Sequence, residues 1–408
     1  MIKLRSMAHP AAGTVPAAAM QPLLLITLQA AAFMVAAEAR VIAALLPALA
    51  ADLHSTIATA GLLITVYALP YGLFQLIYGP LSDRFSRQRV LAIALALFAL
   101  GTLGSGLAPN MAILIGLRIC SGAAAAGVIP VALAYIGDTV PYAERQAALG
   151  RMVGVAAFAG VISAALGGVV AEVVSWRVLF LGYGALALLV AALLLWLPMR
   201  SQQPQGQRAV GILAPYRAIA ERAGRRGAAL YGLVFVEGFA ALGTFGYLGA
   251  LLVTRDQLSY GVAGALLTLN GVGMMLAARA AGRLVARLGE ERMVLLGGAL
   301  MAVAYLLATL QPTLICFPVA MLLSGAGFAL AHSTLQTRAT ELAPEQRGTT
   351  IALFAFAFVL GSGLGSAAAG MAIERIGFGA TLLATAAVLA IFTIVARPLL
   401  RIPATASG

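Results

Sequence analysis

Charged side chains are scarce in this chain of 408 residues: Asp, Glu, Lys and Arg make up 10% of it, whereas hydrophobic residues make up 62%. So few charges cannot cover the surface of a water-soluble globule. The apolar residues instead run in stretches of about 20, which at about 1.5 Å per residue is enough to cross a hydrocarbon core of about 30 Å. The composition therefore excludes a soluble protein and predicts a multi-pass membrane protein.

Cysteine and lysine are nearly absent as well. The two cysteines, Cys120 and Cys316, fall within predicted membrane spans, so no disulfide or metal framework is implied. The single lysine, Lys3, lies close to the N-terminus, so the chain has no phosphate-binding Gly-Lys loop. Neither metal-ligand spacing nor a Ser/His/Asp arrangement is found within the spans. We therefore expect no enzyme activity, no metal and no cofactor.

Apolar stretches divide the chain into two matching halves. We count twelve stretches, six on each side of a polar segment, and predict an all-α membrane protein of twelve transmembrane helices in two pseudo-symmetric six-helix bundles. The expected spans are residues 21–49, 57–79, 90–107, 111–137, 147–170, 178–198, 228–253, 260–281, 293–310, 313–337, 349–372 and 379–397.

Polar segments flank and join the two bundles, which we place at residues 21–198 and 228–397. We expect a cytoplasmic N-terminal tail at 1–20, a cytoplasmic linker at 199–227 and a cytoplasmic C-terminal tail at 398–408. The linker starts with Gln, Pro and Gly and continues with a basic, amphipathic segment. Such a segment is typical either of a helix on an anionic membrane surface or of a solvated tether.

The two predicted bundles are related by an internal repeat with a step of 203 residues. Turn glycines, prolines and loop arginines recur at this step, and such residues coincide by chance less often than Ala or Leu in so apolar a chain. A repeat of this size is typical of a duplicated membrane domain. The pairs include Gly79 and Gly282, Arg84 and Arg287, Pro109 and Pro312, Gly122 and Gly325, and Pro141 and Pro344.

The net charge of +12 comes mostly from arginines on one side of the predicted spans. With the N-terminus inside, 21 of the 26 basic residues fall on that side, in the tails, the linker, the loops and the adjoining ends of the spans. The positive-inside rule then places both termini in the cytoplasm, and we expect a multi-pass protein of the bacterial inner membrane. Because the arginines are divided among loops and form no single surface patch, nucleic acid is not an expected partner.

A charged motif follows the second predicted span. A glycine in such a motif lets two helices approach closely, an acid stands at the membrane boundary, and the arginines after it anchor the loop and pair with the acid. The motif reads Gly79-Pro80-Leu81-Ser82-Asp83-Arg84-Phe85-Ser86-Arg87-Gln88-Arg89. It closely resembles the loop 2-3 signature G-x-L-x-D-R-x-G-R-x-x of the major facilitator superfamily, and the resemblance extends over essentially the whole chain.

The resemblance implies a conformational latch at this loop, which includes Gly79 and Arg84. In the family the motif is described as stabilising the outward-facing state, with the Asp and the second Arg bridging to neighbouring helix ends. By resemblance, Asp83 and Arg87 take those parts. The partners implied are Asp138 or Glu144, at the end of the fourth span.

The second copy of the motif, residues 282–292, keeps the scaffold but changes the charges. Ala286 stands in place of Asp83, and Glu290 stands in place of Arg87. A latch would then be asymmetric and would operate mainly from the first half.

Ionisable side chains inside the predicted spans are few. Arg118 lies in the fourth span, in a sequence similar to the family's R-x-x-x-G pattern. An arginine at the centre of a span costs about 2.5–3.5 kcal/mol on insertion scales, so Arg118 needs an acceptor. Glu38 in the first span has a broadly similar depth, and the two meet if their helix faces agree. Arg40 competes for this acid from another face, because residues two apart on a helix do not point together.

Glu237, in the seventh span, is the other embedded acid. A carboxyl that is buried without a firm partner can exchange protons near neutrality, as a proton-coupled carrier requires. His332, near the cytoplasmic end of the tenth span, is a candidate proton relay. The alternatives are a structural ion pair that never titrates, for Glu38 and for Glu237, and a hydrogen-bonded packing role for the histidine.

Other polar residues in the spans are candidates for a substrate cavity. A single amide inside a helical bundle often serves a helix contact, so none of them identifies a site alone. Pooled with several phenylalanines, they are typical of a mostly apolar site with a few polar contacts. The candidates are Tyr67, Gln75, Tyr247, Asn270 and Gln336.

These features predict a secondary transporter of small organic solutes that rocks its two halves about a midplane site. The chain looks most like bacterial drug/proton antiporters and sugar-efflux relatives, which implies efflux of drug-like or sugar-like compounds driven by a proton gradient. In the fifth span, however, Ala159, Ser163 and Ala164 replace two glycines and the proline of the antiporter signature. A proton-coupled importer or a uniporter of small metabolites is the alternative, and a non-transporting sensor is a remote one. We expect a monomer whose partners are protons, the lipid bilayer and a small-molecule substrate.

Overall fold

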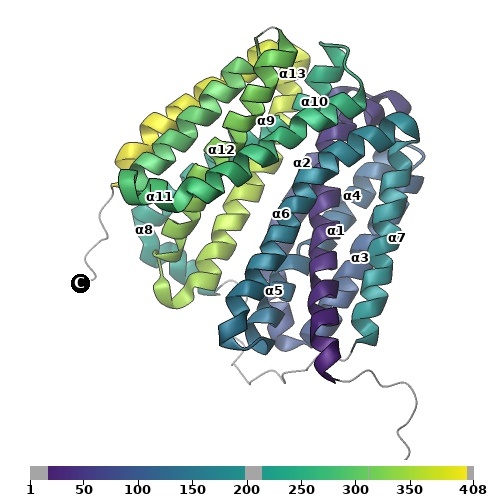
Figure 1. The fold of residues 1–408 in the computed structure, drawn as a ribbon, viewed down its shortest axis with the longest axis vertical. Coiled ribbons are helices and arrows are strands. Elements are labelled where there is room, and N and C mark those ends of the chain that lie inside the picture. The colour runs from purple at the N-terminus through teal and green to yellow at the C-terminus, as the bar shows by residue number, and fades with distance from the viewer. Residues whose placement is uncertain (1–16, 198–213, 311, 402–408) are drawn as a thin grey trace, which may run out of the picture.

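The structure, a computed structural model, describes residues 17–197, 214–310 and 312–401 (Figure 1). The predicted tails at 1–20 and 398–408 and the predicted linker therefore lie partly outside the described residues. The first half consists of seven helices that follow one another through short turns. They are α1 (Ala17–Asp52), α2 (Ile57–Arg84), α3 (Arg87–Leu107), α4 (Met111–Ala125), α5 (Val128–Thr139), α6 (Tyr142–Val173) and α7 (Trp176–Trp196).

The second half repeats this plan with longer and more broken helices. It includes one π-helix, η1, and one short 3-10 turn, η2. Its elements are α8 (Ala214–Glu237), η1 (Gly238–Leu242), α9 (Gly243–Phe245), α10 (Leu248–Thr254), α11 (Tyr260–Leu307), α12 (Thr313–Thr340), η2 (Pro344–Gln346) and α13 (Arg347–Leu400).

Among the described residues, ten helical segments are long and apolar enough to cross a membrane. Two of them, α11 with 48 residues and α13 with 54, are too long for one span, since at about 1.5 Å per residue they would measure about 70–80 Å. Each turns at a glycine with a φ of 78°, Gly289 in α11 and Gly377 in α13, a backbone conformation that glycine adopts without a Cβ clash. Each therefore holds two spans, and the predicted all-α fold of twelve spans in two bundles is confirmed.

Two of the predicted spans are not continuous helices. The fourth is divided into α4 and α5, and the ring of Tyr78 occupies the space that a side chain at Gly127 would need. The seventh is divided among the end of α8, η1, α9 and α10. The spans predicted at 111–137 and 228–253 correspond to the membrane-crossing segments Met111–Thr139 and Glu221–Thr254, but each helix is interrupted within its length. Hydrophobic length does not reveal such interruptions.

The two halves meet near one end of the molecule. We call the end at which α1 begins the inner end, and the end at which α1 finishes the outer end. Figure 1 shows the ribbons of the two halves close together at the upper, outer end and apart at the lower, inner end. At the outer end, Thr65 of α2 donates a hydrogen bond to the Gly363 carbonyl of α13 (2.8 Å), and the Gly261 N–H of α11 donates to Glu172 of α6 (2.7 Å).

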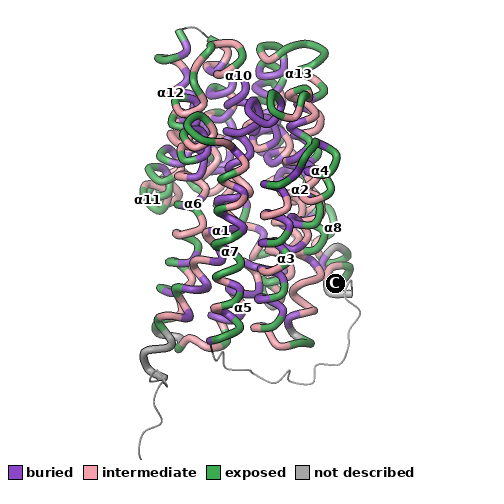
Figure 2. The backbone as a smooth tube through the Cα atoms, turned by 90° about the vertical axis from the view of Figure 1, so that its right-hand side faces the viewer, coloured by how far each residue is buried: buried purple, intermediate pink, exposed green. Residues whose placement is uncertain are grey.

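Glycines bring the halves into backbone contact at this end. A side chain at Gly264 of α11 would collide with the Ala164 carbonyl of α6, and one at Gly249 of α10 would collide with the Ala43 carbonyl of α1. Figure 2 shows a concentration of buried residues near α10, in the upper part of the molecule. The outer end is therefore closed, and the inner end is where the halves separate.

The first turns of α8 form an arm at the inner end. The arm ends at Gly224, which has a φ of 47° and separates it from the membrane-spanning part of the helix. The Tyr216 hydroxyl donates to the Leu76 carbonyl of α2 (3.2 Å). The last part of the predicted linker thus contacts the first half through this hydrogen bond.

Candidate functional site

Two charged centres lie inside the spans, one in each half. The first joins α1 to α4, where Nη1 of Arg118 donates to Oε1 of Glu38 in an ion pair. Both side chains are enclosed, with exposed fractions of 0% for Glu38 and 1% for Arg118. The acceptor that the sequence analysis requires for Arg118 is therefore Glu38.

Aromatic rings complete the surroundings of the Arg118 guanidinium. Cζ of Arg118 lies 4.1 Å from the ring centroid of Tyr67 in α2 and 5.9 Å from the ring centroid of Phe180 in α7. Cation–π attraction and the ion pair together offset part of the cost of burying this charge. Within the part of the chain that the structure describes, Oε2 of Glu38, the Tyr67 hydroxyl and Nε of Arg118 have no hydrogen-bond partner. The centre thus links four helices and holds no net charge.

Arg40, two residues after Glu38, points away from this centre. Its side chain is half-buried and has no hydrogen bond or ion pair with any described residue. Its stem lies against α6, where a Cβ at Gly160 would be 3.4 Å from Cγ of Arg40. Of the two arginines expected to compete for Glu38, the structure pairs Arg118 with it and leaves Arg40 unpaired.

The second centre joins α8 to α12 in the other half. Glu237 is 0% exposed, and its Oε2 lies 2.9 Å from Nδ1 of His332. The other oxygen of Glu237, Oε1, is buried and has no hydrogen-bond partner among the described residues. The His332 side chain is 21% exposed. Two residues that the sequence analysis treated separately thus form one pair, which connects a buried carboxyl to an accessible imidazole.

Three phenylalanines surround the His332 ring. Phe328 of α12 stacks on it with 4.7 Å between ring centroids, and Phe354 and Phe358 of α13 meet it edge to face at 4.9 and 4.6 Å. The π-helix η1 begins directly after Glu237, and π-turns of this kind are frequent at functional sites. The rings hold the imidazole in place and keep the neighbourhood of the carboxyl apolar.

The loop motif lies at the inner end, between α2 and α3. Nη1 of Arg87 is 2.6 Å from Oδ2 of Asp138, so the start of α3 is tied to the end of α5. Of the two acids that the resemblance implies as partners, Asp138 thus pairs with Arg87, and Glu144 is exposed in the first turn of α6. The side chain of Asp83 lies outside the described residues, and the latch itself stays a prediction.

The motif's glycine does not make the close helix contact that the sequence analysis expects. A side chain at Gly79 would meet no atom within 4 Å, and Arg84 nearby is exposed. The reason is that the two halves are apart at this end. The motif is described for the outward-facing state, so a close approach of helices at Gly79 stays a prediction for that state.

The second half carries an ion pair at the equivalent place, with the positions of the acid and the base exchanged. Glu290 of α11, which stands in the position of Arg87, accepts a hydrogen bond from Nε of Arg338 in α12 (2.8 Å). In the first half the base comes from α3 and the acid from α5, whereas in the second half the acid comes from α11 and the base from α12. The changed charges of the second motif therefore form their own link between helix ends.

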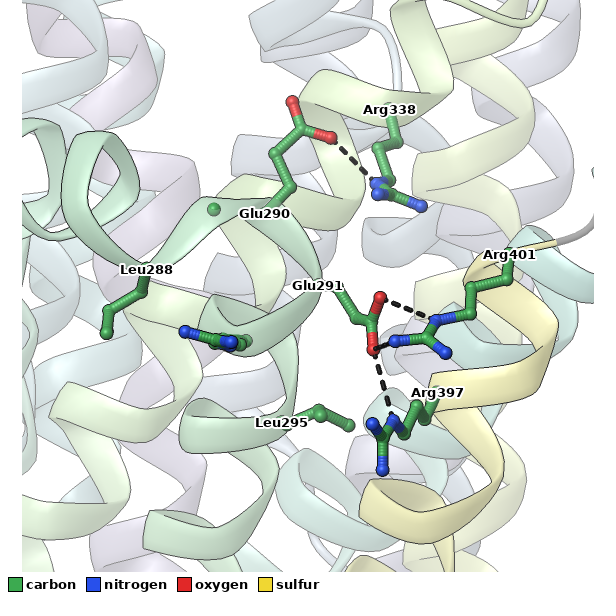
Figure 3. A pocket seen from close by; sticks show the side chains of 9 residues that line it. Leu288, Glu290, Glu291, Leu295, Arg338, Arg397 and Arg401 are labelled. Atoms are coloured by element: carbon green, nitrogen blue, oxygen red, sulfur yellow. Dashed lines mark hydrogen bonds and ion pairs between the residues drawn. The ribbon is translucent and has the colours of Figure 1, made fainter.

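A further charged cluster adjoins this link. Glu291 lies 2.8 Å from Arg401 and 3.3 Å from Arg397, both at the end of α13, and Figure 3 shows both arginines directed at its carboxylate. Together with Glu290 and Arg338 these residues line a cavity of about 730 Å³ at the inner end. The cluster holds the start of the ninth span against the end of the twelfth.

The polar residues proposed for a substrate cavity do not come together. Tyr247 is 1% exposed and donates to the Ser366 carbonyl of α13 (2.9 Å) within the closed outer end. Its ring occupies the space beside Gly61 of α2. The structure therefore places Tyr247 in the contact between the halves and not in an open cavity.

The remaining candidates have separate surroundings, and no hydrogen bond joins two of them among the described residues. Asn270 donates to the Ser324 hydroxyl inside the second half (3.3 Å), and Gln336 is exposed on α12. Gln75 is half-buried in α2, with an unbonded buried oxygen within the described part of the chain. Tyr67 belongs to the first charged centre.

Apart from Tyr247, the residues of the outer contact were not predicted from the sequence, although the repeat held a signal for two of them. Thr65 and Thr268 are 203 residues apart. Each donates a hydrogen bond across the halves, Thr65 to the Gly363 carbonyl and Thr268 to the Val161 carbonyl (3.3 Å). A hydroxyl repeated at equivalent places indicates such a shared contact, whereas Glu172 gives no comparable signal.

Comparison with known proteins places this geometry among membrane transporters. The sequence model of the Major Facilitator Superfamily matches residues 28–254 and 230–408. The uncharacterized MFS-type transporter YceJ of Bacillus subtilis (strain 168) is 27% identical over 342 residues, which cover 83% of this chain and 86% of the relative. A chloramphenicol resistance protein of Pseudomonas aeruginosa is 28% identical over 316 residues, which cover 74% of this chain and 73% of the relative.

A solved structure shows the same fold. The crystal structure of the nucleoside transporter NupG superimposes with a TM-score of 0.78 at 13% sequence identity, and the match covers 93% of this chain and 100% of the other. At this identity the likeness concerns the arrangement of the helices alone.

Proposed function

Because the chain belongs to the Major Facilitator Superfamily, we propose that it is a proton-coupled transporter that exports drug-like or sugar-like small molecules. Its family and its relatives make it a transporter of small molecules and not an enzyme. The proton coupling and the outward direction are the proposal. So is the location, the bacterial inner membrane with both termini in the cytoplasm, and a monomer is the state that we expect there.

The pair of Glu237 and His332 is the observation that carries the proton coupling. Glu237 is fully buried, and only one of its two carboxylate oxygens has a hydrogen-bond partner, the imidazole of His332. Glu38, by contrast, already faces the full positive charge of Arg118. Burying a carboxylate without a full counter-charge is costly, and uptake of a proton removes that cost. Glu237 is therefore the acid that we assign to the transported proton.

His332 supplies a path for this proton. Its Nδ1 contacts the carboxyl, the side chain is 21% exposed, and the residue lies toward the inner end of α12. We therefore assign His332 as the route by which a proton leaves Glu237 toward the inner end. The π-helix that follows Glu237 is a segment whose backbone can rearrange when the halves rock, so a change of protonation acts directly on a movable element.

The outward direction is supported by similarity. One relative is named for chloramphenicol resistance, and the sequence resembles efflux branches of the family. The alternative is a proton-coupled importer or a uniporter of small metabolites, which the altered antiporter signature around Ser163 favours.

Purified protein in liposomes with an imposed pH gradient tests the proposal. A panel of chloramphenicol, other hydrophobic drugs, sugars and amino acids is added, and proton movement is followed with a pH-sensitive dye inside the vesicles. We expect at least one drug or sugar to move protons, and we expect Glu237→Gln to abolish that movement.

Glu374→Gln is the matched control, because Glu374 is an exposed acid near the outer turn of α13. This variant should behave like the unaltered protein. Unchanged proton movement in Glu237→Gln would contradict the assignment, and substrate flux without any proton movement would favour the uniporter.

A further inference from the structure

We propose that Arg40 binds an anionic group of the substrate, so that the transported compounds include organic acids whose carboxylate pairs with its guanidinium. The proposal rests on the transport function proposed above and adds the chemical class of the substrate. The position of Arg40, its lack of a partner and the chemistry around it carry the argument.

Arg40 lies where the accessible face of α1 ends. Phe33, Ala36 and Arg40 are spaced three and four residues apart, so they share one helix face, and all three are half-buried. Residues 41–50, by contrast, are all buried. Ala44, one turn beyond Arg40, belongs to an apolar cluster that includes residues of the second half. The contact between the halves therefore begins within one turn after Arg40, at Ala43 and Ala44.

The helix packed against Arg40 shows the same boundary. On α6, Gly160 lies beside the stem of Arg40, because a Cβ there would be in ordinary contact, 3.4 Å from Cγ of Arg40. The next residue, Val161, accepts a hydrogen bond through its carbonyl from Thr268 of the second half (3.3 Å). Arg40 thus lies at the level where α1 and α6 leave the outer contact. A group at this level is reached from the inner end and is covered from the outer end, as alternating access requires of a substrate site.

The charge of Arg40 lacks compensation within the described part of the chain. Glu38 is bound to Arg118, and Glu237 is bound to His332 in the other half. No described residue forms a hydrogen bond or ion pair with the Arg40 side chain. An unpaired charge within a span is costly, and such residues are usually functional.

An organic acid supplies the negative charge that the surroundings of Arg40 lack. A carboxylate fits the planar guanidinium with two parallel hydrogen bonds and adds the missing negative charge. Phe33 and Ala36, on the same face of α1, offer apolar surface to the rest of the molecule. The expected ligand is therefore a small organic anion with an apolar body.

Arginine modification in the full-length protein tests for this site directly. The protein in nanodiscs is treated with phenylglyoxal, which modifies arginine, and each arginine is followed by mass spectrometry. Benzoate is the probe, and benzamide, which has a similar shape and no charge, is its control. We expect benzoate to slow the modification of Arg40 severalfold and benzamide to leave it unchanged.

Two other arginines serve as internal references. Arg375, which is exposed at the outer turn of α13, should react equally with either compound, and Arg118, which is 1% exposed, should react slowly throughout. Equal modification of Arg40 in benzoate and in benzamide overturns the proposal. So does a failure of Arg40 to react at all, because it would mean that the residue is not reached from the inner end.

Transport by variants separates this inference from the proposed function. In liposomes, Arg40→Gln should raise the KM for benzoate about 10- to 100-fold, the usual effect of losing a hydrogen bond to a charged group, and Arg40→Lys should recover part of the loss. Arg375→Gln should match the unaltered protein. Proton-coupled export of neutral drugs without any benzoate protection leaves the proposed function standing and this inference wrong. If benzoate protects Arg40 and proton movement is unchanged in Glu237→Gln, this inference stands and the proton assignment in the proposed function is wrong.

Discussion

At the scale of single residues, the pair of Glu38 and Arg118 makes each side chain depend on the other. Removing one partner leaves the other charge buried and unpaired, which costs about 3–5 kcal/mol for a buried pair. We predict that Glu38→Gln and Arg118→Gln each lower the apparent Tm of the purified protein by several degrees. The double variant should lose clearly less than the two single losses combined, because it leaves no unpaired charge. Additive losses would show that the pair is not coupled.

The sequence predicts an ion pair within the spans when residue depth alone identifies the partners, and it fails when the rotation of the helices must also be known. Glu38 and Arg118 could be expected to meet, because depth within the membrane follows from counting residues and a buried arginine demands an acceptor. Glu237 and His332 lie 95 residues apart, and their contact depends on the rotation of α8 and α12 about their axes. The spacing of residues along the chain does not determine that rotation. The same limit explains why Tyr247 was placed in a cavity when it lies in the outer contact.

At the scale of the element, the π-helix after Glu237 packs its first residue against α13. A side chain at Gly238 would collide with the Phe358 carbonyl, and it would lie 3.1 Å from the Ser362 nitrogen. We predict that Gly238→Ala lowers the apparent Tm and impairs transport, because α8 and α13 must move apart.

Gly232, in α8 shortly before the π-helix, provides the control. A side chain there meets nothing within 4 Å, so Gly232→Ala should be neutral or stabilise the helix by up to about 1 kcal/mol. The apparent Tm of both variants, measured by thermal unfolding in detergent, tests this prediction. Equal behaviour of the two would show that the close approach of α8 and α13 is not required.

Elements also show what the sequence predicts well. Span number, span order and the turns at repeated prolines follow from hydrophobic length and from the 203-residue step. The break beside Gly127 does not, and neither does the packing of the Tyr78 ring of another helix against that glycine. The second loop motif is instructive in the same way. Its changed charges predict a latch that operates mainly from the first half, yet Glu290 and Arg338 form an ion pair with the acid and the base exchanged.

At the scale of the whole molecule, closure of the outer end depends on the backbones of α6 and α11 touching. A larger residue at Gly264 would strike the Ala164 carbonyl. We predict that Gly264→Val prevents closure, holds the protein open at the outer end and abolishes transport. Pulsed electron paramagnetic resonance between spin labels on the outer ends of α6 and α11 should show a longer distance.

Gly282 is the matched position on the same helix, because a side chain there meets nothing within 4 Å. Gly282→Val should keep the short distance between the labels. A short distance in Gly264→Val as well would contradict the role of this contact. Which end is closed could not be predicted from the sequence, since one sequence must serve both the inner-open and the outer-open arrangement.

The unpaired arginine of α1 also has an electrical consequence. A charge that lies within the bilayer is acted on by the membrane potential, at about 2.3 kcal/mol per elementary charge for each 100 mV that it crosses. When the halves rock, access to Arg40 changes from one aqueous side to the other, so its charge shifts its place in the field even if the side chain barely moves. The transition between the two arrangements should therefore depend on voltage in the unloaded protein, and an anion bound at Arg40 should cancel that dependence.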